Sequence, residues 1–195
     1  MSRNGNEFAL SLLAVAGLTA SVAADLTPGA LVVAPSNGTT ATVTFLGSDA
    51  GYTGHLYFLG WGNGTGITNP VADTGTAGLG QWLFSNHSST PGSTAALDGV
   101  FNAGDVLYFA YDITAPNAAD DLFRADTADD AEHFAYDDAT GRLFIEDLRP
   151  WFSNYDGDYN DAMFTVSFAS VPAPGAAMLL ATGGLCAARR PRRRD

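Results

Sequence analysis

Seven short runs of β-branched and aromatic residues, separated by glycine- and asparagine-rich turns, constrain the fold of this chain more than any other feature. No stretch between residues 25 and 170 keeps the 3.6-residue apolar period of an amphipathic helix. In the last run Phe164, Val166 and Phe168 fall on alternate positions, a pattern typical of a half-buried strand. The runs are Ala41–Leu46, His55–Trp61, Gln81–Phe84, Val106–Ile113, His133–Tyr136, Arg142–Glu146 and Met163–Phe168.

Strands of this length and spacing predict a fold class. Residues 137–141 (DDATG) have the composition of a hairpin turn between two of the runs. Seven or more short strands joined by polar turns are typical of two packed sheets. We therefore predict an all-β domain over residues 25–170, a β-sandwich of the jelly-roll-like kind.

The first 24 residues differ from this body in composition. Arg3 precedes an apolar stretch over residues 9–20, and Val22-Ala23-Ala24 offers small residues for cleavage before Asp25. This is the order of regions in a secretory signal peptide. Residues 1–24 are therefore predicted to direct export and to be removed.

The last 25 residues also read as a separate segment. Residues 175–188 carry no charge, and they would rise about 21 Å as a helix, against a hydrocarbon core of about 30 Å. The arginine cluster that follows would stay cytoplasmic, which leaves the body outside. The alternative is a buried or frayed terminal helix with a basic, nucleic-acid-binding tip. A short transmembrane sorting helix is therefore predicted. It is preceded by Val171, Pro172, Ala173 and Pro174 and followed by Arg189, Arg190, Arg192, Arg193 and Arg194.

This carboxyl-terminal segment, residues 171–195, resembles the PEP-CTERM sorting signal of exported bacterial proteins. That signal combines a Pro-x-Pro motif, a marginal membrane helix and a terminal arginine cluster, and an exosortase processes it at the Pro motif. The resemblance implies an exosortase-type partner and transient anchoring in the membrane. Release to the cell surface, or to a matrix rich in exopolysaccharide, would follow.

Without its two ends the chain is strongly acidic. Residues 25–170 hold 19 acidic residues and three arginines, a formal charge of −16, and the chain has no lysine. Such a surface repels nucleic acid and anionic lipid and favours divalent cations. The single cysteine, Cys186, lies in the sorting segment, so the body has no disulfide.

Oxygen-bearing side chains concentrate just before the last predicted strand. Asp156, Asp158 and Asn160 alternate along the chain, Gly157 permits a tight curl, and Asp161 leads into the strand. Carboxylate and amide oxygens converging in this way suit a hard cation, so calcium is the predicted ligand rather than zinc. The alternative is a solvated acidic turn held by hydrogen bonds from Asp and Asn side chains to the backbone.

This loop is not an EF-hand. Asp161 stands where the EF-hand loop requires glycine, and Ser167 stands where it requires glutamate.

A second resemblance covers roughly residues 100–168. The Glu146-Asp147-Leu148 element, followed by Gly157-Asp158 and Asn160-Asp161, is similar to the family called domain of unknown function 4114. That family occurs in exported and adhesin-like bacterial proteins. The resemblance implies a β-rich exported module with calcium ligands, and it extends the predicted metal set to Glu146, Asp147, Asp156, Asp158, Asn160 and Asp161.

Further acidic residues gather upstream of this loop. Their spacing is irregular, which favours a solvated loop, with a weaker second cation site as the alternative. They are Asp120, Asp121, Asp126, Asp129, Asp130, Glu132, Asp137 and Asp138.

Catalytic motifs are missing from the sequence. The three histidines follow no metal-ligand spacing, and there is no G-x-S-x-G element. His133, beside Glu132, is expected to be structural. We therefore predict a protein that is not an enzyme: an exported, exosortase-sorted cell-surface or matrix protein stabilised by calcium.

The alternative function is a calcium-dependent carbohydrate-binding module. Trp151 and Tyr155 would stack on sugar rings beside the acidic loop, with Trp61 and Trp82 as further candidates.

Overall fold

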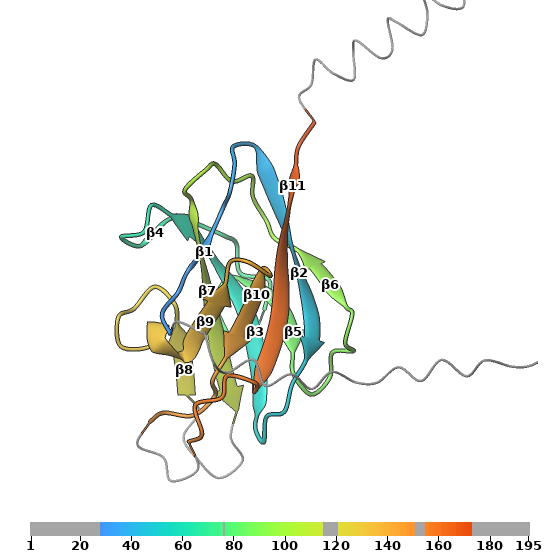
Figure 1. The fold of residues 1–195 in the computed structure, drawn as a ribbon, viewed down its shortest axis with the longest axis vertical. Helices are drawn as coiled ribbons and strands as arrows, with labels where there is room; N and C mark the ends of the chain where they lie inside the picture. The colour runs from blue at the N-terminus through green and yellow to red at the C-terminus, as the bar shows by residue number, and fades with distance from the viewer. Residues whose placement is uncertain (1–27, 76, 115–120, 151–154, 173–195) are drawn as a thin grey trace, which may run out of the picture.

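The described part of the chain consists of antiparallel strands in two sheets (Figure 1). The structure, a computed structural model, describes residues 28–75, 77–114, 121–150 and 155–172. The predicted signal peptide, Trp151 and the sorting segment beyond Pro172 lie outside the described residues.

The strands are short and follow one another closely. In chain order they are β1 (Val32–Val33), β2 (Thr39–Gly47), β3 (Thr53–Gly62), β4 (Ile67–Pro70), β5 (Gln81–Ser85), β6 (Thr94–Ala96), β7 (Val106–Thr114), β8 (Asp121–Arg124), β9 (Phe134–Asp137), β10 (Arg142–Ile145) and β11 (Ala162–Ser170), with a 3-10 turn, η1 (Ala131–His133), before β9.

The predicted strands are confirmed. All seven runs coincide with strands, except that His133 ends η1 instead of starting β9. The turn at residues 137–141 joins β9 to β10, as predicted, and Gly141 has a φ of 68° there. The sequence patterns missed β1, β4, β6 and β8, each of four residues or fewer.

One sheet has the strand order β6-β2-β11-β10-β9. The other has the order β1-β7-β3-β4, with β5 also pairing with β3 and β8 with β7. β11 lies between β2 and β10, and it pairs with β2 over almost its whole length (Figure 1).

The two sheets share one hydrophobic core. On β2, Val43 and Phe45 are buried while the residues between them are partly exposed, and Phe164 repeats this pattern on β11. The ring of Phe45 lies 5.5 Å from that of Phe164 and 6.1 Å from that of Phe84, on β5 of the other sheet. The fold is therefore all-β with two antiparallel sheets, which is consistent with the predicted β-sandwich.

The outer faces of the sheets are partly covered by loops. Tyr159, from the loop before β11, packs with Ala135 and Phe144 on the outer face of the β9–β10–β11 region. This contact holds the acidic loop against the sheet. Among the described residues, no helix is long and apolar enough to cross a membrane.

Candidate metal centre

The end of β10 and the start of β11 bring the two acidic elements together. Ile145 and Ala162 are partners across these antiparallel strands. Glu146 follows the first and Asp161 precedes the second, so the register places their side chains at the same end of the sheet. The backbone N–H of Asp147 donates to Oδ2 of Asp161 at 2.7 Å, which joins the two elements.

Two of these carboxylates are buried with an oxygen that has no hydrogen-bond partner. Glu146 is 1% exposed and Asp147 is 5% exposed. Oε1 of Glu146 accepts from the N–H of Leu148 at 3.3 Å. Oε2 of Glu146 and Oδ2 of Asp147 are buried and have no partner. A buried, unsatisfied carboxylate oxygen is costly, which points to a ligand that completes it.

The loop before β11 is fixed by backbone geometry and by its own side chains. Gly157 has a φ of 64°, in the left-handed region that favours glycine. Tyr159 has a φ of 56°, and its hydroxyl donates to the carbonyl of Glu132 at 2.7 Å. Asp158 accepts from both the backbone N–H and the side-chain amide of Asn160, at 3.1 and 2.6 Å. These contacts present the loop's carboxylates to the strand ends.

Five predicted ligands converge in two groups that share Glu146. One group is Glu146, Asp156 and Asp158, and the other is Glu146, Asp147 and Asp161. Within each group the ligand oxygens lie within 4.8 Å of one another. Calcium binds oxygens at about 2.3–2.6 Å, so two oxygens on one ion are at most about 5 Å apart. Each group therefore has the spacing that one calcium ion requires.

Burial and mutual repulsion hold these carboxyl groups toward their protonated form. Burial, followed by the charges of Asp161 and Asp156, raises the pKa of Asp147 to about 7. Burial and the charge of Asp161 also raise the pKa of Glu146, and burial raises that of Asp161. A divalent cation would supply the positive charge that keeps such groups ionised.

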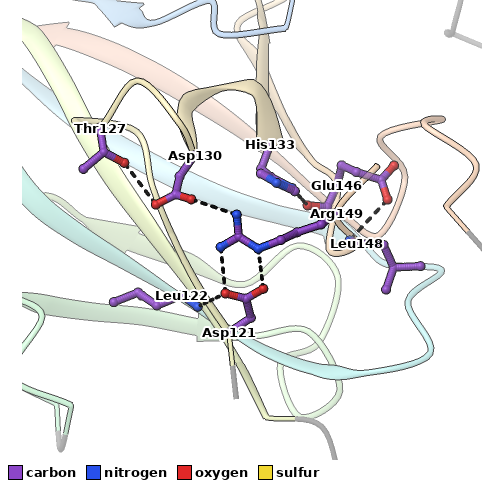
Figure 2. Close-up of polar contacts among 8 residues, drawn as sticks. All are labelled: Asp121, Leu122, Thr127, Asp130, His133, Glu146, Leu148 and Arg149. Carbon is purple, nitrogen blue, oxygen red and sulfur yellow. Dashed lines mark hydrogen bonds and ion pairs between the residues drawn. The ribbon is translucent and has the colours of Figure 1, made fainter. Parts of the chain in front are cut away.

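Arg149 anchors the segment that carries Glu146 and Asp147 (Figure 2). Its Nε and Nη2 donate to the two carboxylate oxygens of Asp121 at 2.7 and 2.8 Å, and its Nη1 donates to Asp130 at 3.2 Å. Figure 2 shows the carboxylate of Glu146 pointing away from this guanidinium. Arg149 therefore holds the segment in place without occupying the candidate metal position.

His133 supports the same segment from its backbone. Its Nδ1 donates to the carbonyl of Glu146 at 3.0 Å, and the N–H of Glu146 donates to the carbonyl of His133 at 3.0 Å. The imidazole stacks on Phe123, with ring centroids 3.6 Å apart, and the Arg149 guanidinium lies 4.8 Å from the same ring. Burial lowers the pKa of His133, so the ring is neutral. These contacts give His133 a structural role.

The other predicted site residues have different positions. The side-chain amide of Asn160 donates a hydrogen bond to Asp158, which is itself a predicted ligand. Tyr155 lies against Gly157, where an added Cβ would be 3.1–3.3 Å from the tyrosine ring and hydroxyl. Trp61 packs against Phe101, with their ring centroids 5.2 Å apart.

Part of the upstream acidic region is held by ion pairs, whereas Asp129, Glu132 and Asp138 are exposed as expected of a solvated loop, and residue 120 lies outside the described residues. Arg149 pairs with Asp121 and Asp130, and Arg124 pairs with Asp126 at 3.0 Å. Sequence reasoning missed this role of Arg149. The available signal was that only three basic residues occur between residues 25 and 170, and one follows Glu146-Asp147-Leu148 directly.

A pocket of about 440 Å³ lies on the face of the second sheet that points away from the shared core. Tyr57 and Trp82 are cross-strand partners on β3 and β5, and His55 is opposite Asp112 on β7. Trp82 is 42% exposed. The pocket is lined by His55, Tyr57, Thr74, Gly75, Ala77, Trp82, Asp112 and Thr114.

Thr74 and Gly75, which line this pocket, are held by hydrogen bonds. Asp73 accepts from the N–H of Gly75 and Thr74 accepts from the N–H of Trp82, both at 3.0 Å.

Comparison of the chain with protein-family models, with curated proteins and with solved structures finds no match.

Proposed function

We propose that this chain is an exported, non-catalytic cell-surface or matrix protein whose β-domain is stabilised by calcium bound at the acidic centre. The observation that carries the proposal is the pair of buried, unpartnered oxygens, Glu146 Oε2 and Asp147 Oδ2, each within a group of three carboxylates. All the charged donors are carboxylates, and oxygen ligands favour calcium over zinc.

Calcium would stabilise the folded domain for two reasons. It removes the repulsion among carboxylates that the fold buries together, and it joins the loop before β11 to the end of β10. The unfolded chain cannot assemble these groups, so the ion binds the folded state and shifts the folding equilibrium toward it.

Export fits the same picture. The sequence has a signal-peptide pattern at residues 1–24 and a segment resembling PEP-CTERM signals at residues 171–195. The body has no cysteine, so disulfides cannot stabilise it outside the cell. A bound ion would serve that purpose where extracellular calcium is abundant, and an exosortase-type enzyme would process the tail.

The test is a melting experiment on the full-length chain. After metal is removed with a chelator, calcium chloride at about 100 times the dissociation constant should stabilise the fold by about 2.7 kcal/mol. For a domain of this size, that raises Tm by roughly 5–10 °C.

The control variants separate specific binding from a general salt effect. Asp158→Asn removes one carboxylate of the centre and should abolish most of the rise. Asp138→Asn removes an exposed carboxylate in the β9–β10 turn and should leave the rise intact. An unchanged Tm in the unsubstituted chain, or an equal rise in both variants, would contradict the proposal.

Glycan binding is the second candidate function, and the Trp82 pocket favours it. An exposed indole offers a flat surface for the C–H face of a sugar ring, and Thr74, His55 and Asp112 offer polar groups for its hydroxyls. The volume of about 440 Å³ lies within the range of small-ligand sites. Burial, followed by the charges of Asp112 and Asp73, raises the pKa of Tyr57. The negative charge of these two carboxylates favours neutral or basic sugars over acidic ones.

A glycan array probed with the full-length chain tests this candidate. Trp82→Ala should abolish binding to neutral or basic sugars, and Val100→Ala, at another exposed apolar residue, should not. Loss of binding on Trp151→Ala instead would place the sugar beside the acidic loop. Failure of the unsubstituted chain to bind any glycan would exclude the candidate.

A further inference from the structure

The acidic centre contains two groups of carboxylates that share Glu146. The groups Glu146–Asp156–Asp158 and Glu146–Asp147–Asp161 each keep their ligand oxygens within 4.8 Å, and they share only Glu146. Oxygens on one calcium shell are at most about 5 Å apart. Each group of three carboxylates meets that limit, so each can hold one ion. We propose that the centre binds two calcium ions, with Glu146 bridging them; this rests on the proposed calcium function.

Each group contains a buried oxygen that needs a partner. Glu146, whose Oε2 has no partner, belongs to both groups, and Asp147, whose Oδ2 has no partner, belongs to the group with Asp161. Both residues are more than nine-tenths buried, since Glu146 is 1% exposed and Asp147 is 5% exposed. A cation at each group would give both buried oxygens a partner.

Charge balance favours the same stoichiometry. Five ionised carboxylates carry a charge of −5, which one calcium ion reduces to −3 and two reduce to −1. The remaining nearby cation does not change this, because Arg149 is engaged by Asp121 and Asp130. Two ions therefore leave little uncompensated charge among groups that the fold buries.

The two positions differ in access to solvent. Asp156 is exposed and Asp158 is partly exposed, whereas the second group contains the buried Asp147. The outer ion, held by Asp156 and Asp158, should exchange with solvent faster and bind more weakly. The inner ion, held by Asp147 and Asp161, should remain after mild chelation.

Calcium stoichiometry of the full-length chain tests the inference. Metal-stripped protein is titrated with calcium chloride alone, and bound calcium is counted by native mass spectrometry and calorimetry. The unsubstituted chain should bind two ions. Asp156→Asn should bind one and lose the weaker event, Asp161→Asn should bind one and lose the tighter event, and Asp138→Asn should bind two.

The possible outcomes separate this inference from the proposed function. No bound calcium would exclude both. One ion in the unsubstituted chain, with a rise in Tm, would retain the calcium function and overturn the two-ion centre. The inference would also be overturned if the unsubstituted chain bound two ions but Asp156→Asn and Asp161→Asn changed calcium binding in the same way. Because Asp156 is exposed, its variant is expected to fold, and a near-UV circular dichroism spectrum checks this for each variant.

Discussion

Glu146 and Asp147 are buried carboxyl groups, and the charges around them decide whether they hold a proton. Their neighbours in space are other carboxylates, while Arg149 is directed toward Asp121 and Asp130. The metal-free centre therefore lowers its charge by holding protons, and a cation replaces those protons when it binds. Sequence spacing indicates which oxygens gather, but it does not show which of them are buried or where Arg149 points.

The raised pKa values predict how stability depends on pH in the metal-free protein. The pKa of Asp147 rises from its usual value to about 7 in the fold. The stability that its proton provides is fully present below about pH 4 and is lost as the pH rises through about 7. Glu146 and Asp161 act in the same direction because their pKa values are also raised.

We expect Tm in chelator to fall between pH 5 and pH 8, by roughly 3–5 °C per unit for each proton involved. His133, whose pKa is lowered, opposes this change as a single group against three carboxyls. Asp147→Asn should flatten the slope, and Asp138→Asn should not. A metal-free Tm that rises over this interval would show that these carboxyls do not control stability.

At the scale of elements, the sequence predicts long strands well and short ones poorly. β2, β7 and β11 have nine residues each, enough for alternation or a dense apolar run to be visible. β4 has four residues and only one of them, Ile67, is even partly buried, so its pairing with β3 comes from tertiary contacts and not from its own pattern. β1, β6 and β8 were missed because they have only two to four residues, too few to show alternation.

The acidic centre was predictable in composition but not in arrangement. The Asp156–Asp161 loop and the Glu146-Asp147 element are visible in the sequence as neighbours of strands. Their meeting depends on the pairing of β10 with β11, whose register sets Ile145 opposite Ala162. A shift of one residue would turn these side chains to the other face of the sheet. The division into two ligand groups therefore could not be predicted from the sequence and is visible only in the three-dimensional structure.

At the scale of the whole molecule, the two ends of the sequence and the acidic body belong to different stages of one proposed route. The five carboxyl-terminal arginines lie in the proposed sorting segment, and the body carries a formal charge of −16. Processing at both ends would leave a strongly anionic domain in an environment that supplies calcium. The proposed cation centre and the proposed export signals are thus consistent with each other.

Fractionation of a bacterial host that has an exosortase-type enzyme tests the proposed route. The mature protein should begin at Asp25, lack the residues after the Pro172–Pro174 motif, and be found outside the inner membrane. A chain ending at Ser170 should be exported without a membrane-bound stage. In a host without the enzyme, the full-length chain should remain in the membrane fraction. Recovery of the intact chain from the cytoplasm would contradict the export proposal.

The position of β11 has a mechanical consequence. This strand is hydrogen-bonded to β2 on one side and β10 on the other, its first residue follows the acidic loop, and its last residue leads to the sorting segment (Figure 1). A pull along the axis of β11 at Ser170 would load both ladders in shear, so many hydrogen bonds would have to break together. An ion joining Asp161 to the end of β10 would lock the far end of the loaded strand. A tether at this end would therefore attach to a strand that is hydrogen-bonded on both sides.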